Sequence, residues 1–576
     1  MNAQTAPAAD IDFEREHDEY LEVERLMRNP LAYAASLNND ILMFHQAMKA
    51  EDSQSFVDAM IKEINGHVDS NNWQLIPKSE VPADQEIIPS VWAFRRKRNL
   101  STGEITKHKA RLNIHGGYQT YGENYFDTYS PVIAWPAIRF LITLSELHGW
   151  RSAQVDFVMA FPQAPIQHDL YMQLPHGVTS ISDGEFVLKL TANLYGQKQA
   201  GRVWNHHLVN VLVNKMGFRQ SVSDECVFIK DKLIFICYVD DGIIFDTGED
   251  DAAIGNFMDQ LKEGGMECEN QGTPADFIGV AISRDNDGFI KFTQRTLIDT
   301  VIKDAGLFNK HRKKKTPAKS SEILQAHLDS PPFDPSAFGF EYRSLLGKLN
   351  YLAQTTRPDL LYAVHQCARF SCNPREMHGK ALQHIVMYLC DTPHIGLKFR
   401  PDPSQGFVTY VDADFSGNWD PKHSDADPAT AKSRSGWVIF YAGCLVLAAS
   451  KLQTQVALST TEAEYIALST CLRDVIPLME LVDELRALGF PVICTEPYIY
   501  CKLFEDNSGA LEMVRVPKQR QRTKHINCSY HHFREHVRKG LIKIFPIKTD
   551  LQPADILGKP VPQNILLPHR KVICGE

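Results

Sequence analysis

Two adjacent aspartates, Asp240 and Asp241, interrupt an apolar stretch that runs from Leu233 to Phe245. The short apolar segments on either side favour a β-hairpin with an Asp-Asp-Gly turn between its strands. Like charges beside a buried sheet are unfavourable unless a cation lies near them, and carboxylate oxygens are the ligands that Mg²⁺ prefers. The pair therefore predicts either a simple polar turn or one half of a metal site.

A third carboxylate favours the metal site. Asp156 lies inside the apolar segment Ala153-Gln-Val-Asp-Phe-Val158, where a strand is expected and a turn is not. Three carboxylates from two strands can hold two Mg²⁺ ions, the arrangement with which polymerases activate a 3′-hydroxyl and stabilise the leaving pyrophosphate. Two predicted strands that meet at Ser101-Thr-Gly103 form a basic hairpin, and charged side chains of this kind bind phosphate.

A second set of acidic residues follows in the C-terminal part of the chain: Asp412, Glu464, Asp506 and Asp555. Asp412 and Asp414 are two residues apart on a predicted strand, so their spacing cannot choose between them. In the predicted helix that follows, Glu464 shares the apolar face, whereas Glu462 points about 200° away. A carboxylate on the side of a helix that faces a sheet needs a partner, and a metal ion is a natural one.

The formal charge of −9 argues weakly against a nucleic-acid partner, because such proteins usually have a basic surface. Residues 1–64, however, hold 13 acidic and 5 basic residues, which accounts for −8 of that total. The segment from Arg515 to Lys543 holds nine Lys or Arg and one Glu. The acidity therefore belongs mainly to a tail that we expect to be disordered, and basic segments remain for phosphate contacts.

The length of 576 residues predicts three to four domains, and 44% hydrophobic with 23% charged residues is ordinary for globular proteins. None of the 12 cysteines forms a Cys-x-x-Cys pair, which favours a reduced intracellular protein, cytoplasmic or nuclear. The longest nearly apolar run, Trp437 to Ala449, is too short to cross a bilayer, and the N-terminus does not have the pattern of a secretion signal. We expect no membrane partner.

The order of many short segments resembles the reverse transcriptase–ribonuclease H region of a copia-type LTR retrotransposon Pol polyprotein. The resemblance runs from about Phe56 to Pro560. The segments that carry it are Lys109-Ala-Arg-Leu112, Leu194-Tyr-Gly-Gln-Lys-Gln-Ala200, Tyr238-Val-Asp-Asp241, Tyr342-Arg-Ser-Leu-Leu-Gly347, Arg357-Pro-Asp359, Thr461-Glu-Ala-Glu-Tyr-Ile-Ala467, Lys524-His-Ile526 and Ala554-Asp-Ile-Leu557. Any one of them could arise by chance, but their common order could not.

The resemblance implies a multidomain α+β and α/β fold, with a right-hand polymerase followed by a ribonuclease H-like domain on a mixed sheet. The expected parts are an acidic tail over 1–45, fingers and palm over 46–290, thumb and connection with a basic linker over 291–402, and the ribonuclease H-like domain over 403–576. The implied activity is RNA-directed DNA synthesis together with degradation of RNA in RNA–DNA hybrids.

The resemblance also assigns residue roles. Asp156, Asp240 and Asp241 would be the polymerase carboxylates, and Asp412, Glu464, Asp506 and Asp555 those of the nuclease. Each set would hold two Mg²⁺ ions, with Mn²⁺ as a substitute. Lys109 and Arg111 would contact the incoming triphosphate, Gln199 would lie near nucleotide and template, and Phe161 would crowd a ribose 2′-hydroxyl. From its pattern alone, Phe161 is predicted to be a core residue.

The expected partners are an RNA template, a DNA primer and product, the RNA–DNA hybrid and deoxynucleoside triphosphates. The integrase and protease of the same element would come from other regions of the polyprotein. Departures from the family pattern, Gln197 for Leu, Gly201 for Pro and Gly558 for Thr, remove no predicted metal ligand. Two alternatives stay open: a decayed or domesticated copy that binds nucleic acid without catalysis, and a cellular DNA polymerase or hybrid nuclease.

Overall fold

The computed structural model describes residues 40–98, 104–177, 185–248, 250–307, 313–320, 323–326, 330–421, 428–493, 500–515 and 528–576. The predicted acidic tail falls almost wholly outside these residues. So do the turn at 101–103, part of the basic linker, and residues 516–527 of the basic segment, including Lys524-His-Ile526. No helix in the described part of the chain is long and apolar enough to cross a membrane.

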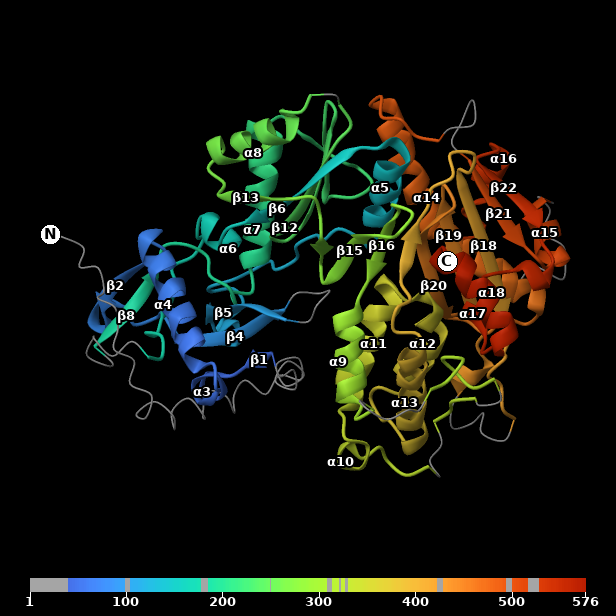
Figure 1. Cartoon of the computed structure of the whole chain (residues 1–576), viewed down its shortest axis with the longest axis horizontal. Helices are drawn as coiled ribbons and strands as arrows, with labels where there is room; N and C mark the ends of the chain where they lie inside the picture. Colours follow the sequence, from blue (N-terminus) through green and yellow to red (C-terminus); the bar gives the residue numbers. More distant parts are fainter. Residues whose placement is uncertain are drawn as a thin grey trace.

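The N-terminal part, drawn in blue, and the C-terminal part, drawn in orange to red, lie at opposite ends of the molecule (Figure 1). Between them stand three helices: α11 (Tyr342–Thr355), α12 (Leu361–Ala368) and α13 (Glu376–Asp391). Several separate sheets, each with helices packed on it, form the rest of the chain. The expected class, a mixed α and β protein with several sheets, is confirmed.

The basic hairpin belongs to a three-stranded sheet. Strand β4 (Ser90–Arg98) pairs antiparallel with β5 (Ile105–Ile114), and β1 (Ile41–Leu42) adds to β4. Helix α4 (Ser53–Asp69) packs on β5. Because side chains alternate along a strand, Ala110 and Leu112 are buried, while Lys109 and Arg111 point to the opposite face. The two predicted phosphate-binding residues therefore share one face of the sheet.

The central sheet has six strands in the order β13-β6-β12-β11-β10-β9, and every neighbouring pair is antiparallel. Its strands are β6 (Arg151–Phe157), β9 (Arg219–Gln220), β10 (Val227–Lys230), β11 (Leu233–Tyr238), β12 (Asp241–Asp246) and β13 (Cys268–Gly272). Helices α7 (Ala200–Val209) and α8 (Ala253–Glu263) pack on one face, and α5 (Trp135–His148) packs on the other. The sheet is therefore buried on both sides, which explains its nearly continuous apolar strands.

The turn of the β11–β12 hairpin differs from the prediction. Tyr238 pairs with Asp241, so the two turn residues are Val239 and Asp240. The predicted Asp-Asp-Gly turn is wrong, because Gly242 lies inside β12. A Cβ atom on Gly242 would lie 2.6 Å from the ring of Phe235, so the glycine permits close packing across the hairpin and does not form the turn.

A five-stranded mixed sheet forms the C-terminal part, in the order β20-β19-β18-β21-β22. Its strands are β18 (Phe407–Asp414), β19 (Arg434–Tyr441), β20 (Cys444–Leu452), β21 (Cys501–Glu505) and β22 (Ile542–Pro546). The first three are antiparallel to one another, and β21 and β22 run parallel to β18. Helix α14 (Thr460–Ala487) packs on β18 and β19. The long helix thus lies beside the strand that carries Asp412.

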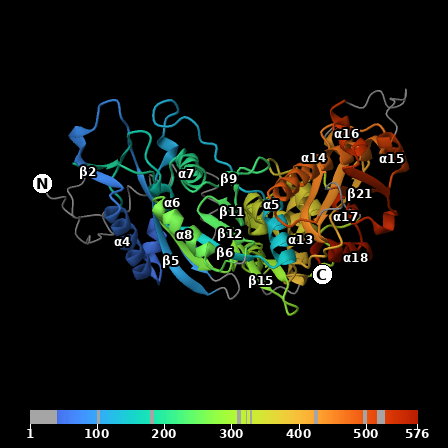
Figure 2. The same ribbon diagram turned by 90° about the horizontal axis from the view of Figure 1, so that it is seen from above.

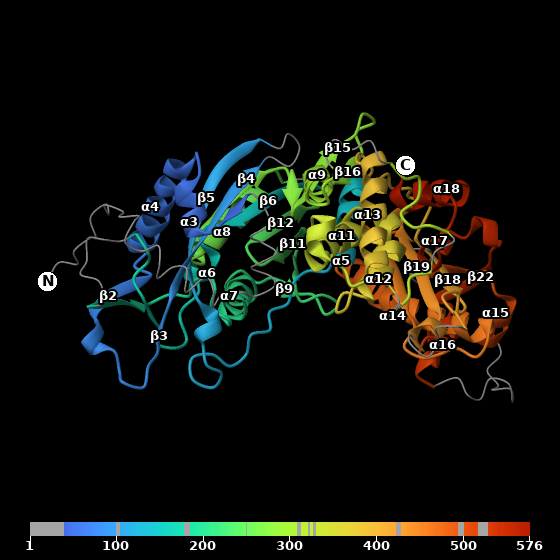
Figure 3. The same ribbon diagram turned by 90° about the horizontal axis from the view of Figure 1, so that it is seen from below.

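Helix α5 joins the central sheet to the C-terminal sheet, between which it lies in both turned views (Figures 2 and 3). One apolar core continues from α5 through α11–α13 into the five-stranded sheet. Arg139 of α5 is only 4% exposed. Its guanidinium donates to the carbonyl oxygens of Val446 at 3.1 Å, Thr355 at 2.7 Å and Gln354 at 2.5 Å. A single buried cation therefore ties α5 to β20 and to the end of α11.

We expect Arg139→Met to lower the free energy of unfolding by about 3 kcal/mol, because three carbonyl groups lose their donor at roughly 1 kcal/mol each. Urea unfolding followed by circular dichroism measures the change. Arg284→Met is the matched control, since Arg284 is more than half exposed and pairs with Glu146 of α5, the helix that carries Arg139. Its loss should cost less than about 1 kcal/mol. Equal effects of the two variants would contradict the role of Arg139 in holding α5 against β20 and α11.

Two candidate carboxylate sites

The first candidate site lies at the tip of the β11–β12 hairpin. Asp241 begins β12 and pairs with Asp156 on β6, while Asp240 occupies the turn beside it. Glu269 of β13 pairs with Asp156 from the other side. The structure therefore places the three predicted carboxylates at neighbouring backbone positions and adds Glu269, which the sequence analysis did not single out. Within the described residues, their oxygen atoms do not form a group within 4.8 Å of one another, as those of the second site do.

Burial and the repulsion of neighbouring charges raise the pKa values of Asp241 and Asp156. Burial raises the pKa of Asp241 to about 6, and the charges of Asp240 and Asp156 add to the effect. Burial also raises the pKa of Asp156, although the nearby Lys109 ammonium opposes this. For Lys109, burial lowers the pKa and Arg111 adds to that, while Asp156 acts in the opposite direction. The basic strand and the carboxylates are thus close enough to influence one another, and hard oxygen donors of this kind suit Mg²⁺.

The turn that holds Asp240 has an unfavourable backbone. Val239 has φ of +58°, in the left-handed region that a β-branched residue rarely adopts. Such a conformation costs roughly 1–2 kcal/mol. Contacts around the turn must therefore hold it, since the turn residues by themselves do not favour it.

Two of the remaining residues predicted for this site, Arg111 and Phe161, contact the ring of Tyr195. The Arg111 guanidinium lies 4.0 Å from the centroid of the Tyr195 ring, and that ring lies 4.7 Å from the ring of Phe161. Gln199 is buried, and its Oε1 accepts a hydrogen bond from Nε2 of Gln119 at 3.0 Å. Tyr195 was not predicted by itself, although it belongs to the segment 194–200 quoted above. Its ring connects Arg111 to Phe161.

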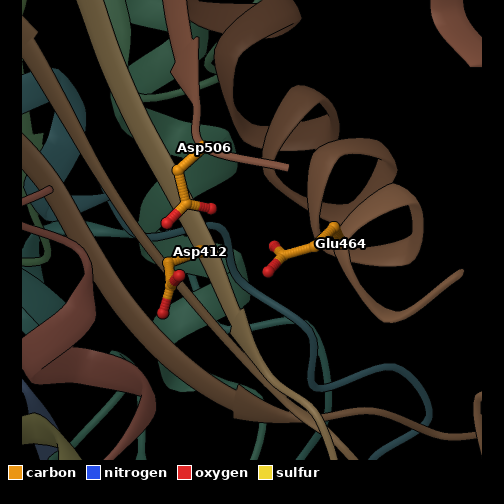
Figure 4. Close-up of side chains that lie close together, drawn as sticks. All are labelled: Asp412, Glu464 and Asp506. Atoms are coloured by element: carbon orange, nitrogen blue, oxygen red, sulfur yellow. The ribbon is translucent and has the colours of Figure 1, made fainter. Parts of the chain in front are cut away.

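The second candidate site lies on the five-stranded sheet. Asp412 comes from β18, Glu464 from α14, and Asp506 directly follows β21. One carboxylate oxygen of each lies within 4.8 Å of the other two, and the three side chains point toward a common space (Figure 4). Asp555 begins α17 (Asp555–Gly558) and forms an ion pair with Lys559 at 2.5 Å. Its charge acts on Asp412, but it lies outside the group of three.

The structure distinguishes Glu464 from Glu462 and Asp412 from Asp414, two pairs in which the residues are only two positions apart. Glu462 is buried as well, but its Oε2 accepts the backbone N–H of Leu458 at 2.7 Å at the start of α14. It therefore helps to cap the helix, whereas Glu464 faces Asp412. Of the pair on β18, Asp412 joins the cluster. Asp414 is half-buried, with Lys559 among the charges that act on it.

The second site is more deeply buried than the first. Asp412 is 5% exposed and Glu464 is 6% exposed. Burial raises the pKa of Asp412 to about 7, with the charge of Asp555 adding to it. Burial raises the pKa of Glu464 to about 11, and Glu505 and Asp412 contribute. Within the described residues, Oε2 of Glu464 has no hydrogen-bond partner. Buried, mutually repelling oxygen donors with an unfilled bonding position fit a divalent cation such as Mg²⁺.

Glu505 is an acidic residue of this region that sequence reasoning missed. It is fully buried, and burial raises its pKa well above the ordinary value for a glutamate. Its Oε1 accepts the backbone N–H of Asn507 at 3.0 Å. Cys501, Leu503 and Glu505 alternate with less buried residues along β21, so the period-two pattern could have identified a buried carboxylate here.

A family model described as reverse transcriptase (RNA-dependent DNA polymerase) matches residues 70–320. The chain is 31% identical over 519 residues to the retrovirus-related Pol polyprotein from transposon RE1 of Arabidopsis thaliana, covering 89% of this chain and 33% of the polyprotein. It is 28% identical over 530 residues to that from transposon TNT 1-94 of Nicotiana tabacum, covering 90% and 38%. The chain thus spans about a third of the length of these curated relatives.

A solved structure entitled foamy viral protease-reverse transcriptase in complex with dsDNA aligns with 86% of this chain and 83% of its own. The identity is 14% and the TM-score is 0.46. A second structure of the foamy viral protein, in complex with RNA/DNA hybrid, aligns with 95% of this chain and 56% of its own, at 12% identity and a TM-score of 0.42.

Mg²⁺ should stabilise the protein more at pH 8 than at pH 6. The folded-state pKa values of Asp412 and Glu464 are raised, so without a cation the folded state binds more protons than the unfolded state. Stability therefore falls as the pH rises from about 4, through about 7 for Asp412 and through about 11 for Glu464, and a cation that replaces those protons offsets the loss. The melting temperature at pH 8 should rise by roughly 3 °C in 10 mM MgCl₂ relative to KCl of equal ionic strength, and by less at pH 6.

Asp412→Asn should remove at least half of the stabilisation by Mg²⁺, because it takes away one of three clustered ligands. Asp287→Asn is the control, since Asp287 is 60% exposed and pairs with Arg400 at the surface. An equal Mg²⁺ effect in the wild type and in the Asp412 variant would exclude a cation at this cluster.

Proposed function

We propose that the chain, whose residues 70–320 match the reverse transcriptase family model, is part of a copia-type retrotransposon Pol polyprotein, and that it copies RNA into DNA and degrades the RNA of the resulting hybrid. One observation carries the proposal: carboxylates distant in sequence gather at two separate places. Asp156, Asp240 and Asp241 lie on the central sheet, and Asp412, Glu464 and Asp506 on the C-terminal sheet. Two such sets support two reactions of phosphodiester chemistry.

DNA synthesis is assigned to the first set. Two Mg²⁺ ions, when bound by Asp156, Asp240 and Asp241, would activate the primer 3′-hydroxyl and stabilise the leaving pyrophosphate. Lys109 and Arg111 share one face of β5 and would bind the triphosphate of the incoming deoxynucleotide through charge-assisted hydrogen bonds. The proximity of Lys109 to Asp156 supports this, because a triphosphate bound to metal ions at the carboxylates would also lie within reach of the Lys109 ammonium group.

Phe161 and Gln199 are assigned to selection of the nucleotide. Phe161 packs against Tyr195, which in turn lies under the Arg111 guanidinium. An aromatic ring beside the triphosphate-binding arginine would crowd a ribose 2′-hydroxyl and favour deoxynucleotides. Gln199 directly precedes α7 and accepts a hydrogen bond from Gln119, and it would lie near the nucleotide and the template.

RNA cleavage is assigned to the second set. Two Mg²⁺ ions, when bound by Asp412, Glu464 and Asp506 with Asp555 beside them, would activate water and stabilise the departing oxygen. The protein orients these ligands: Thr549 Oγ1 donates to Oδ2 of Asp506 at 2.9 Å, and Lys559 pairs with Asp555. In this scheme no side chain acts as a covalent nucleophile.

The proposed substrates and partners follow from the two reactions. They are an RNA template, a DNA primer and product, the RNA–DNA hybrid, and deoxynucleoside triphosphates with Mg²⁺ or Mn²⁺. Because the chain spans about a third of its curated relatives, we propose that the integrase and protease of the element belong to other regions of a longer polyprotein.

Asp240→Asn should reduce primer extension on an RNA template by more than about 100-fold while RNA cleavage in a hybrid is retained. Glu464→Gln should do the reverse, so each variant is the control for the other. Both activities are measured on the same labelled RNA–DNA substrate. If both fall together in each variant, the two-site assignment is wrong. If the wild type binds hybrid but shows no synthesis with Mg²⁺ or Mn²⁺, the chain is a decayed or domesticated copy that only binds nucleic acid.

Phe161→Val should raise the incorporation of ribonucleotides relative to deoxynucleotides by about 10- to 100-fold, because the smaller side chain leaves room for the 2′-hydroxyl. Single-nucleotide extension with matched ribo- and deoxynucleoside triphosphates measures the ratio. Phe126→Val is the control, since Phe126 is 49% exposed and lies in the segment between β5 and α5. An unchanged ratio in the Phe161 variant would remove this residue from the sugar-binding part of the site.

A further inference from the structure

A buried tryptophan lies directly beneath the turn that carries Asp240. Trp204 of α7 is 1% exposed, and its Nε1 donates to the carbonyl oxygen of Val239 at 2.6 Å. Its ring also meets the ring of Phe157 edge-on, at 5.1 Å between centroids. Phe157 directly follows Asp156 in β6. One side chain therefore contacts both the turn before Asp240 and the neighbour of Asp156.

The turn needs external support. Val239 is held at φ of +58°, and a two-residue hairpin turn with a positive φ at its first position ordinarily has glycine there. In the described residues, the carbonyl oxygens of this turn accept two hydrogen bonds besides that from the indole. The Cys237 thiol donates to Val239 at 3.3 Å, and the backbone N–H of Phe157 donates to Asp240 at 3.2 Å. The indole bond is the shortest of the three.

Trp204 is itself held rigidly, so its N–H has a fixed direction. Helix α7 packs through Val203 and Leu208 into the apolar core beneath the central sheet. The indole, together with Val239 and Cys237, lines a small cavity behind the hairpin. A group fixed from the helix side can therefore determine where the turn lies relative to β6.

We propose that Trp204 is a positioning residue that holds Val239 in the left-handed conformation and thereby sets the separation of Asp156 and Asp240. The inference rests on the proposed polymerase function of these carboxylates. Trp204 touches no substrate. It acts through the indole–carbonyl bond and through its contact with Phe157.

Trp204→Phe keeps an aromatic ring in the core and removes the N–H donor. In full-length protein bound to primer and RNA template, the single-turnover rate of nucleotide addition should fall at least tenfold. The deoxynucleotide concentration for half-maximal rate should change less than threefold, whereas the Mg²⁺ concentration for half-maximal rate should rise at least threefold. Cleavage of hybrid RNA at the second site should stay within twofold of the wild type.

A readout that does not depend on activity is hydrogen exchange of the segment 233–246. Loss of the indole donor should speed exchange of the amides at the turn at least tenfold, while the rest of the central sheet is unchanged. Trp92→Phe is the matched control. Trp92 lies on β4 of the three-stranded sheet and is also buried, and its Nε1 donates to the carbonyl oxygen of His176 at 3.0 Å. It should alter neither the turn amides nor nucleotide addition.

Val239→Gly provides a rescue, because glycine adopts a positive φ without strain. The double variant Trp204→Phe with Val239→Gly should recover at least one third of the lost rate. A Trp204→Phe protein with wild-type rate and wild-type exchange at the turn would overturn the inference, and so would a failure of Val239→Gly to rescue. An inactive wild type, or an active Asp240→Asn variant, would instead refute the polymerase assignment itself.

Discussion

Burial of like-charged carboxylates beside apolar sheets is the constraint on which the rest of the structure depends. Asp412 and Glu464 are almost completely buried within 4.8 Å of Asp506, and Asp241 pairs with Asp156 on the central sheet. Each arrangement raises the free energy of the metal-free protein, because removal from water disfavours charge and neighbouring charges repel. Only an extensive and continuous core can tolerate this, and the structure has one. A bound cation offsets the same cost.

The core also fixes the two sites relative to each other. Arg139 ties α5 to β20 and α11, and Glu484 of α14 pairs with Arg219 of β9 at 3.1 Å and accepts a hydrogen bond from Ser221 at 2.6 Å. These polar contacts reinforce aromatic packing of Phe140 against Tyr441. In the proposed function, one RNA–DNA hybrid is the substrate of both reactions. These contacts between α5, α14 and the two sheets would then set the distance along the duplex between the point of synthesis and the point of cleavage.

Local patterns predicted much of this arrangement because burial follows the period of each element. The alternation along β5 separates Lys109 and Arg111 from the buried residues beneath them, and the helical spacing in α14 distinguishes Glu464 from Glu462. The hairpin was also predictable, but its turn was not. Gly242 suggested a turn, whereas it is required by the ring of Phe235 across the hairpin. Period and composition contain no information about a neighbouring strand's side chain.

The sequence by itself determined which acidic residues lie within apolar elements and hence which require a partner, because hydrophobic periodicity is a local property of the chain. It also determined, through the order of its segments, the family resemblance. Only the tertiary structure chose Asp412 over Asp414, added Glu505 and Tyr195, and placed Trp204 under the turn of Val239. Those choices depend on contacts between residues far apart in the chain, whose geometry is set by packing and not by local pattern.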